Sequence, residues 1–293
     1  MRTIRLGTFS PSVLLEVATG ALVDAGLTVV ESPAQSSSQQ FTDLFEGRLD
    51  AVFTNPDNVL AYRLVPDNPL GRTDDVRILG AIDRGLGLSL FTGPARRLGT
   101  FGVDVPGSGF AFIGYELLAR AGLSRDVDYQ VTTVGSTPRR ARALIDGAID
   151  CTVLNAGNDL LAEDHGAVRG ASVTEIGPYV GTVLAATADS LAHNGDDLST
   201  LLDVVTTTAR AIRSHPAIAT AAIERRLGLT EATAARHLAI LTDPTQGLVT
   251  DSTLTVDDLR TIVDLRNRHA RSATTLTIAD AVASGLLHTP LRR

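Results

Sequence analysis

The chain has 293 residues, 44% of them hydrophobic and 20% charged, which suits one large globular domain or two modest ones. Its formal net charge of −7 argues against a nucleic-acid partner, because phosphate neutralisation requires clustered basic side chains. A single cysteine excludes an internal disulfide and a cysteine-based zinc site. No apolar run approaches the roughly 20 residues that span a bilayer, so we expect no membrane insertion.

The N-terminal residues predict a small α/β unit. The loop at 6–12 follows a β-like run and leads into an apolar-periodic segment that Gly26 stops. A second β-like run at 28–31 and a polar loop at 36–39 precede a helix, and 51–53 forms the third strand. This alternation of strand and helix is typical of a lobe with a mostly parallel sheet.

The same pattern returns 100 residues later. Segments 44–60 and 144–160 share Leu, Gly, Asp, Asn, Asn and Leu at matching positions without a gap. A repeat at this spacing indicates two similar lobes rather than a solenoid. Two such lobes facing each other leave a central cleft, which is where small molecules bind.

Further strands and helices complete the predicted α/β fold. Between the repeats, 86–92 resembles a strand that leaves the first lobe, and 183–187 resembles a return strand. Beyond them, apolar residues recur at helical spacing, which predicts a helical C-terminal region at 198–212, 217–227, 231–241 and 256–270. We therefore predict a discontinuous first lobe (1–92 and 188–293), a second lobe (93–187) and a closing hinge near 92–95 and 183–188.

Several motifs resemble the periplasmic solute-binding proteins of ABC importers. They are residues 102–112, Asp128-Tyr129 with Val134-Gly135, and Leu154-Asn155 with 160–162. Residues 54–61, the turn at 248–254 and the helix at 259–266 are similar to the branch that binds nitrate, sulfonate, taurine and thiamine-pyrimidine precursors. The resemblance covers nearly the whole chain. It implies a type II periplasmic-binding-protein-like fold, a small anionic or heteroaromatic organic ligand and, if the protein is exported, an ABC permease as partner.

The N-terminus departs from the exported members of that family. Residues 1–6 run into the first strand without the apolar region or cleavage site of a signal peptide. We expect the chain as written in the cytoplasm, or in the periplasm or at the cell surface if it is a processed form. Because the same fold also hosts cytoplasmic enzymes, the alternative function is a metal-independent decarboxylase or lyase.

Ligands in open α/β sheets sit beyond the carboxyl ends of the strands. Four of the polar loops there also open a helix, so their N–H groups and hydroxyls favour an anion, although Ser and Thr also serve as helix caps. Arg84 is the preferred cation, with Arg139 and Arg140 next. The predicted ligand-binding residues are Phe9, Ser10, Ser12, Ser37, Asn55, Asp57, Arg84, Ser108, Gly109, Ser136 and Asn155.

Asn55 and Asn155 end equivalent strands and would face each other across the cleft, although both also suit a turn.

Signals for catalysis are weak. Cys151 lies in an apolar strand and is interpreted as a small buried hydrophobe. Asp57 and Asp83 are the only candidates for an acid/base pair. None of the six His stands at metal-ligand spacing, so we expect no metal and no cofactor.

Residues 227–241 resemble the helix-turn-helix of bacterial repressors. Only Arg236 and His237 are basic on the presumed recognition helix, and base recognition requires more than that. The segment is interpreted as a Thr-capped surface helix.

Overall fold

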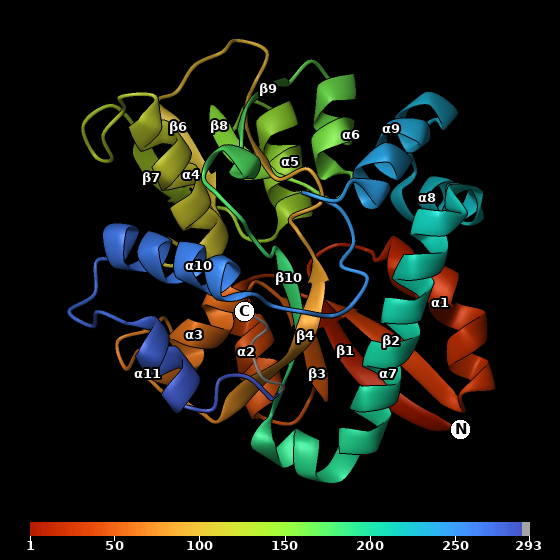
Figure 1. Ribbon diagram of the computed structural model, residues 1–293. Coiled ribbons are helices and arrows are strands. Elements are labelled where there is room, and N and C mark those ends of the chain that lie inside the picture. The colour runs from red at the N-terminus through yellow and green to blue at the C-terminus, as the bar shows by residue number, and fades with distance from the viewer. Residues whose placement is uncertain (289–293) are drawn as a thin grey trace.

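The computed structural model of the protein describes residues 1–288 and contains two five-stranded sheets, one above the other in Figure 1. The first sheet has the order β2-β1-β3-β10-β4 and the second has the order β7-β6-β8-β5-β9. The strands are β1 (Arg2–Thr8), β2 (Leu27–Pro33), β3 (Ala51–Thr54), β4 (Val76–Asp83), β5 (Ser89–Thr92), β6 (Thr100–Val103), β7 (Gln130–Thr133), β8 (Cys151–Leu154), β9 (Val168–Ser172) and β10 (Thr182–Thr187).

Helices surround both sheets (Figure 1). Helices α1 and α7 pack on one face of the first sheet, and α2 and α3 cover the other face. None of the described helices combines the length and hydrophobicity that a membrane crossing requires. The helices are α1 (Val13–Asp24), α2 (Ser37–Phe45), α3 (Pro56–Leu64), α4 (Gly109–Arg120), α5 (Thr137–Ile145), α6 (Asn158–Asp164), α7 (Ala188–Ser214), α8 (Thr220–Leu227), α9 (Glu231–Thr242), α10 (Val256–His269) and α11 (Ile278–Ala283), with 3₁₀ turns at Val173–Glu175 and Pro216–Ala219.

The sequence repeat corresponds to equivalent contacts in the two sheets. The Asp50 carboxylate accepts a hydrogen bond from the Arg5 backbone N–H at 2.7 Å, and Asp150 accepts one from the Thr100 N–H at 2.9 Å. In both cases the acid precedes the third strand of its repeat and ties that strand to the first. The predicted two-lobed α/β fold is confirmed.

The strand pairing corrects two details of the prediction. Strand β5 pairs with β8 and β9 in the second sheet, so the chain leaves the first sheet before Ser89 and not at 92–95. Strand β10 then returns to the first sheet between β3 and β4. Both inserted strands run antiparallel to their neighbours, so the sheets are mixed rather than mostly parallel. Residues 289–293 of the predicted first lobe lie outside the described residues.

The predicted C-terminal helices are all present. Helix α7 begins earlier than predicted because Thr187 caps it by accepting a hydrogen bond from the Ser190 N–H. Helix α10 packs against both α3 and α4, and its Arg266 forms a buried ion pair with Asp57 of α3 at 2.7 Å. The same guanidinium lies over the ring of Phe112 in α4. Helix α10 thus joins elements that belong to the two predicted lobes.

Candidate functional site

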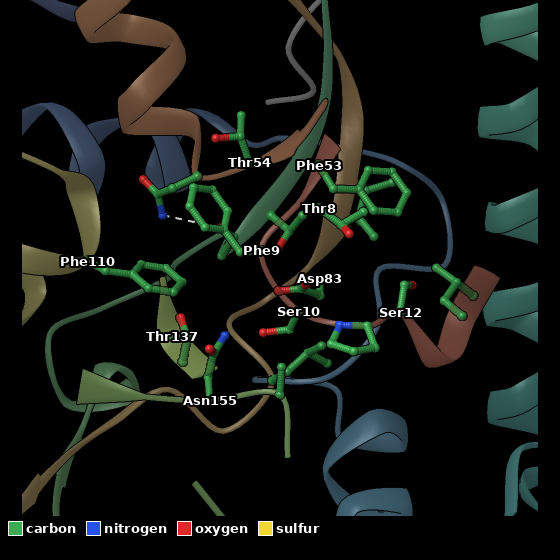
Figure 2. A pocket seen from close by; sticks show the side chains of 18 of the residues that line it. Thr8, Phe9, Ser10, Ser12, Phe53, Thr54, Asp83, Phe110, Thr137 and Asn155 are labelled. Carbon is green, nitrogen blue, oxygen red and sulfur yellow. Dashed lines mark hydrogen bonds between the residues drawn. The ribbon is translucent and has the colours of Figure 1, made fainter. Parts of the chain in front are cut away.

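A cavity of about 110 Å³ lies where the carboxyl ends of strands from both sheets meet. Three aromatic rings, those of Phe9, Phe53 and Phe110, contribute to its apolar wall (Figure 2). Its polar and ionisable lining residues are Thr8, Ser10, Ser12, Thr54, Asn55, Asn58, Asp83, Asp104, Ser108, Thr137, Arg140, Asn155, Thr182 and His237. An apolar cavity with a few convergent polar groups is the usual form of a small-molecule site.

Arg140 is a fully buried cation in the cavity wall. Its guanidinium donates only to neutral oxygen atoms, namely the Gly135 carbonyl at 2.7 Å, the Thr137 hydroxyl at 3.0 Å and the Val153 carbonyl at 3.3 Å. Its Nε–H has no partner, and among residues 1–288 the side chain forms no ion pair. Burial lowers the pKa of Arg140 to about 10, although the nearby Asp104 carboxylate acts in the opposite direction.

The sequence repeat explains how Arg140 is held. Gln40 occupies the equivalent position in α2 and donates to the Phe53 carbonyl at 3.1 Å, as Arg140 does to the equivalent Val153 carbonyl. Both side chains are buried. The second repeat therefore keeps the structural hydrogen bond and adds a positive charge beside the cavity.

Direct contacts join the two predicted lobes around the cavity. The Asp104 carboxylate, which follows β6, accepts hydrogen bonds from the Ser37 N–H at the start of α2 at 3.0 and 3.2 Å. Burial raises the pKa of Asp104. The Ser136 N–H donates to the Gln35 carbonyl at 2.9 Å, and Asn158 donates to the Ser10 hydroxyl at 3.1 Å.

Asp83 ends β4 and is a buried carboxylate on the cavity wall (Figure 2). It accepts a hydrogen bond from the Gly85 N–H at 2.8 Å. Burial raises its pKa to about 6, and hydrogen bonds from the Thr182 side chain and the Gly85 N–H oppose that shift. Among the described residues, no cation pairs with Asp83, and the neighbouring Arg84 pairs with Asp258 at 2.8 Å.

His237 of α9 is also buried in the cavity wall. Its Nδ1 has no hydrogen-bond partner, and burial lowers its pKa to about 4, so the ring is neutral near pH 7. Helix α9 also bridges the lobes, since Thr233 donates to Asp164 at 3.1 Å and Arg236 pairs with Glu163 of α6. The predicted surface helix is thus a wall of the cavity.

Six predicted ligand residues line the cavity, namely Phe9, Ser10, Ser12, Asn55, Ser108 and Asn155. Both asparagines also fix the chain where it passes between the sheets. Asn55 donates to the Tyr179 hydroxyl at 2.6 Å and to the Gly181 carbonyl at 3.2 Å, and Asn155 donates to the Gly85 carbonyl at 2.8 Å. Both asparagines therefore line the cavity and also hold the backbone in place, which is close to the structural alternative, a turn, that the sequence left open.

The other predicted residues lie outside the cavity lining, and each has a different role. Asp57 and Arg84 are engaged in ion pairs with Arg266 and Asp258, so neither Arg84 as preferred cation nor Asp57 as half of an acid/base pair fits the geometry. Ser37 and Ser136 contact the opposite lobe through their backbone N–H groups. At Gly109, a Cβ would lie 2.1 Å from the Asn55 Oδ1, so this glycine permits close packing.

Sequence reasoning missed Thr8, Asp104, Thr182 and His237 as lining residues. Thr8 and Asp104 stand at or just after the ends of strands, so the strand-end rule could have found them. His237 gave no comparable signal, because it lies on a helix. Within residues 1–288, no group of three or more His, Cys, Asp or Glu is arranged to hold a metal ion.

No protein-family model matches the chain, and no curated protein matches its sequence. Solved structures do match. The periplasmic nitrate-binding protein NrtA from Synechocystis PCC 6803 has a TM-score of 0.78 at 13% identity over 98% of this chain and 86% of that chain. The alkanesulfonate-binding protein SsuA from Xanthomonas axonopodis pv. citri, bound to MOPS, has a TM-score of 0.75 at 16% identity over 96% and 98%.

A third match is the ligand-binding component of an ABC-type import system from Staphylococcus aureus, with zinc bound. Its TM-score is 0.73 at 12% identity, over 96% of this chain and 95% of that chain. The chain has the fold of the periplasmic solute-binding proteins. At these identities the likeness establishes the solute-binding-protein fold and leaves the ligand to the residues of the cavity.

Proposed function

We propose that the protein binds a small organic anion in the inter-sheet cavity and acts as the solute-binding component of an ABC-type uptake system. The observation that carries the proposal is Arg140, a buried cation beside the cavity that forms no ion pair within the described residues. The proposal includes an ABC permease as partner and a cellular location in which the protein can contact that permease.

The electrostatics of the second lobe favour an anion. A buried charge is costly unless it is paired, and the guanidinium of Arg140 has only neutral hydrogen-bond acceptors. Thr137, at the start of α5, also lines the cavity, and the N-terminus of a helix carries partial positive charge. The negative charge of Asp104 offsets part of the positive potential from Arg140 and the start of α5. Its carboxylate oxygen atoms already accept hydrogen bonds from the Ser37 N–H.

The aromatic wall accounts for the organic part of the ligand. Phe9 follows β1, Phe53 lies in β3 and Phe110 lies in the first turn of α4, and the three rings border one cavity. Contacts with such rings favour a hydrocarbon or a ring over a bare inorganic ion, which would leave the apolar surface uncovered.

The test compares benzoate with its neutral analogue benzamide by isothermal titration calorimetry and thermal shift. Arg140→Gln removes the charge, and Gln40 shows that a glutamine at this position reaches the equivalent carbonyl, so the variant is expected to fold. Loss of a charge-assisted hydrogen bond is expected to weaken benzoate binding by roughly 10- to 100-fold and to leave benzamide binding nearly unchanged.

Arg139→Gln is the matched control, because Arg139 is the neighbouring residue on α5 and its side chain is exposed. This variant is expected to bind benzoate as the wild type does. Equal benzoate affinities for the Arg140→Gln variant and the wild type, or no benzoate-induced stabilisation of the wild type, would contradict the proposal.

A metal-independent enzyme on the same fold is the second candidate, because Asp83 has a pKa near 6 inside the cavity, which suits a general acid or base. The sequence contains no lysine, which excludes a Schiff base formed by a side-chain amine. Recovery of a bound ligand in chemically altered form after long incubation would favour this candidate. Recovery of the ligand unchanged supports a binding protein.

A further inference from the structure

We propose that Asp83 and His237 form a second recognition site at the β4–α9 end of the cavity, which binds a nitrogen that carries a hydrogen. The ligand is then an amphoteric organic acid, with its acidic group towards Arg140 and an amine or ring N–H towards Asp83 and His237. This inference rests on the proposed function and adds the chemical class of the ligand.

Asp83 has acceptor capacity that the protein does not use. An ionised carboxylate offers about four lone-pair sites, and the Gly85 N–H and the Thr182 side chain are its only partners among the described residues. The carboxylate is nearly fully buried, with 3% of its residue surface exposed, and no cation pairs with it. A buried carboxylate of this kind is best satisfied by a donor that arrives with the ligand.

His237 supplies a second unpaired polar group. Only 1% of its surface is exposed, and among residues 1–288 neither ring nitrogen has a hydrogen-bond partner. Nδ1 is buried without a partner and the residue lines the cavity, so the ring offers a polar group that the protein itself does not use. A neutral imidazole accepts at one nitrogen and donates at the other, and it therefore suits an uncharged or cationic N–H group.

Contacts along the chain bring these two residues to one end of the cavity. Leu241 lies one turn after His237 on the same face of α9, and its carbonyl accepts from the Leu248 N–H at 2.9 Å. Leu248 in turn pairs with Asp83 in an isolated β-bridge. All four residues line the cavity.

Arg140 belongs to a different part of the wall. It extends from α5 in the second repeat, and Asp104 is the charged group that acts on it. No charged side chain of the described residues contributes to the pKa shift of Asp83. Asp83 ends β4 of the first sheet, whereas Arg140 lies on α5 of the second repeat, so the cation and the unpaired carboxylate come from different parts of the fold, as recognition of a ligand with two unlike polar ends requires.

The experiment compares acids that differ only in an amino group, by isothermal titration calorimetry at pH 7. The pairs are 3-aminopropanesulfonate with propanesulfonate, and 4-aminobenzoate with benzoate, which separate an aliphatic ammonium from an aromatic amine. In at least one pair, the amino compound is expected to bind the wild type roughly tenfold more tightly than its partner.

Asp83→Asn and His237→Leu are each expected to remove most of that difference. Asp24→Asn, at an exposed position of α1, is the matched control and keeps the difference. If one variant fails to fold, the other variant and the two compound pairs measured on the wild type still test the second recognition site.

The outcomes separate this inference from the proposed function. The second recognition site is wrong if the acids with and without the amino group bind equally well, or if the preference for the amino compound survives in both variants. In either case the anion-binding function stands. If none of the four acids binds the wild type, the proposed function fails and this inference fails with it.

Discussion

Asp83 is a carboxylate whose ionised form opposes folding. Burial raises its pKa from 3.8 to about 6, so the folded state holds the proton more tightly than the unfolded chain does. Its contribution to stability is therefore most favourable below about pH 4 and is lost as the pH rises to about 6 and beyond. A shift of about two pKa units corresponds to about 3 kcal/mol.

Asp83→Asn is expected to stabilise the folded protein at pH 7, because the amide keeps an acceptor for the Gly85 N–H and carries no charge. The gain in unfolding free energy is up to about 3 kcal/mol at pH 7 and falls towards zero near pH 4. Urea denaturation at pH 4, 5, 6 and 7 measures it, with Asp24→Asn as control. A constant difference between variant and wild type across this range would show that Asp83 does not carry the effect.

The predicted cavity residues succeeded or failed for reasons visible at single positions. Asn55 and Asn155 follow strands directly and Ser10 follows β1 after one intervening residue, so the strand-end rule located them. Arg84 was preferred because it follows a predicted strand and lies between two apolar runs near the predicted crossing, but its side chain reaches Asp258 instead of the cavity. The sequence shows which residue type stands at the end of a strand, but it does not show the direction in which that side chain points.

At the level of elements, the two segments that connect the sheets touch at glycines. A Cβ on Gly181, just before β10, would lie 2.4 Å from the Gly85 Cα and 2.7 Å from the Asp83 Oδ1. Because the first of these atoms is backbone, a side chain there would force the two connections apart. Gly181 therefore permits the close approach that brings β10 alongside Asp83.

Gly181→Ala is expected to lower the unfolding free energy by roughly 1–3 kcal/mol through this overpacking. Gly195→Ala is the matched substitution with the opposite expected sign. It lies inside α7 with no neighbouring atom within 4 Å of the added Cβ, so the gain in helix propensity should stabilise the protein by roughly 0.5–1 kcal/mol. Urea denaturation of both variants without ligand measures the pair. Equal effects would mean that the contact with Gly85 is not tight.

Helices were predicted more reliably than the partners they pack against. Apolar periodicity identified α8, α9 and α10, because each has one buried face. It could not show that the buried face of α9 includes the cavity, since that depends on the turn at Asp243–Gly247, which folds the following segment back onto β4. The polar start of α7 escaped prediction because its first turns are largely exposed and carry no apolar repeat.

At the level of the whole molecule, the sequence predicted two similar lobes joined by two crossings, but it placed each crossing one strand too late in the chain. Strand β5 follows β4 in the chain and joins the other sheet, as β10 does in return. The equivalent segments of the repeat carry no mark of this exchange, because pairing partners far apart in the sequence are set by packing. The resulting pair of connections, at 84–88 and 173–181, is where a hinge between the sheets would act.

Closure around the cavity is expected to depend on ligand. The contacts between the lobes around the cavity include polar ones, and in this arrangement Arg140 and Asp83 are both buried without an ion pair among the described residues. The ligand-free protein should therefore favour an open arrangement, and an anion should shift the population to the closed one.

Small-angle X-ray scattering should show a smaller radius of gyration for the wild type with a saturating acid than without it. The Arg140→Gln variant, which buries one charge fewer, should already be more compact without ligand and change less on its addition. A wild-type radius that stays constant at saturation would mean that the cavity fills without movement of the lobes.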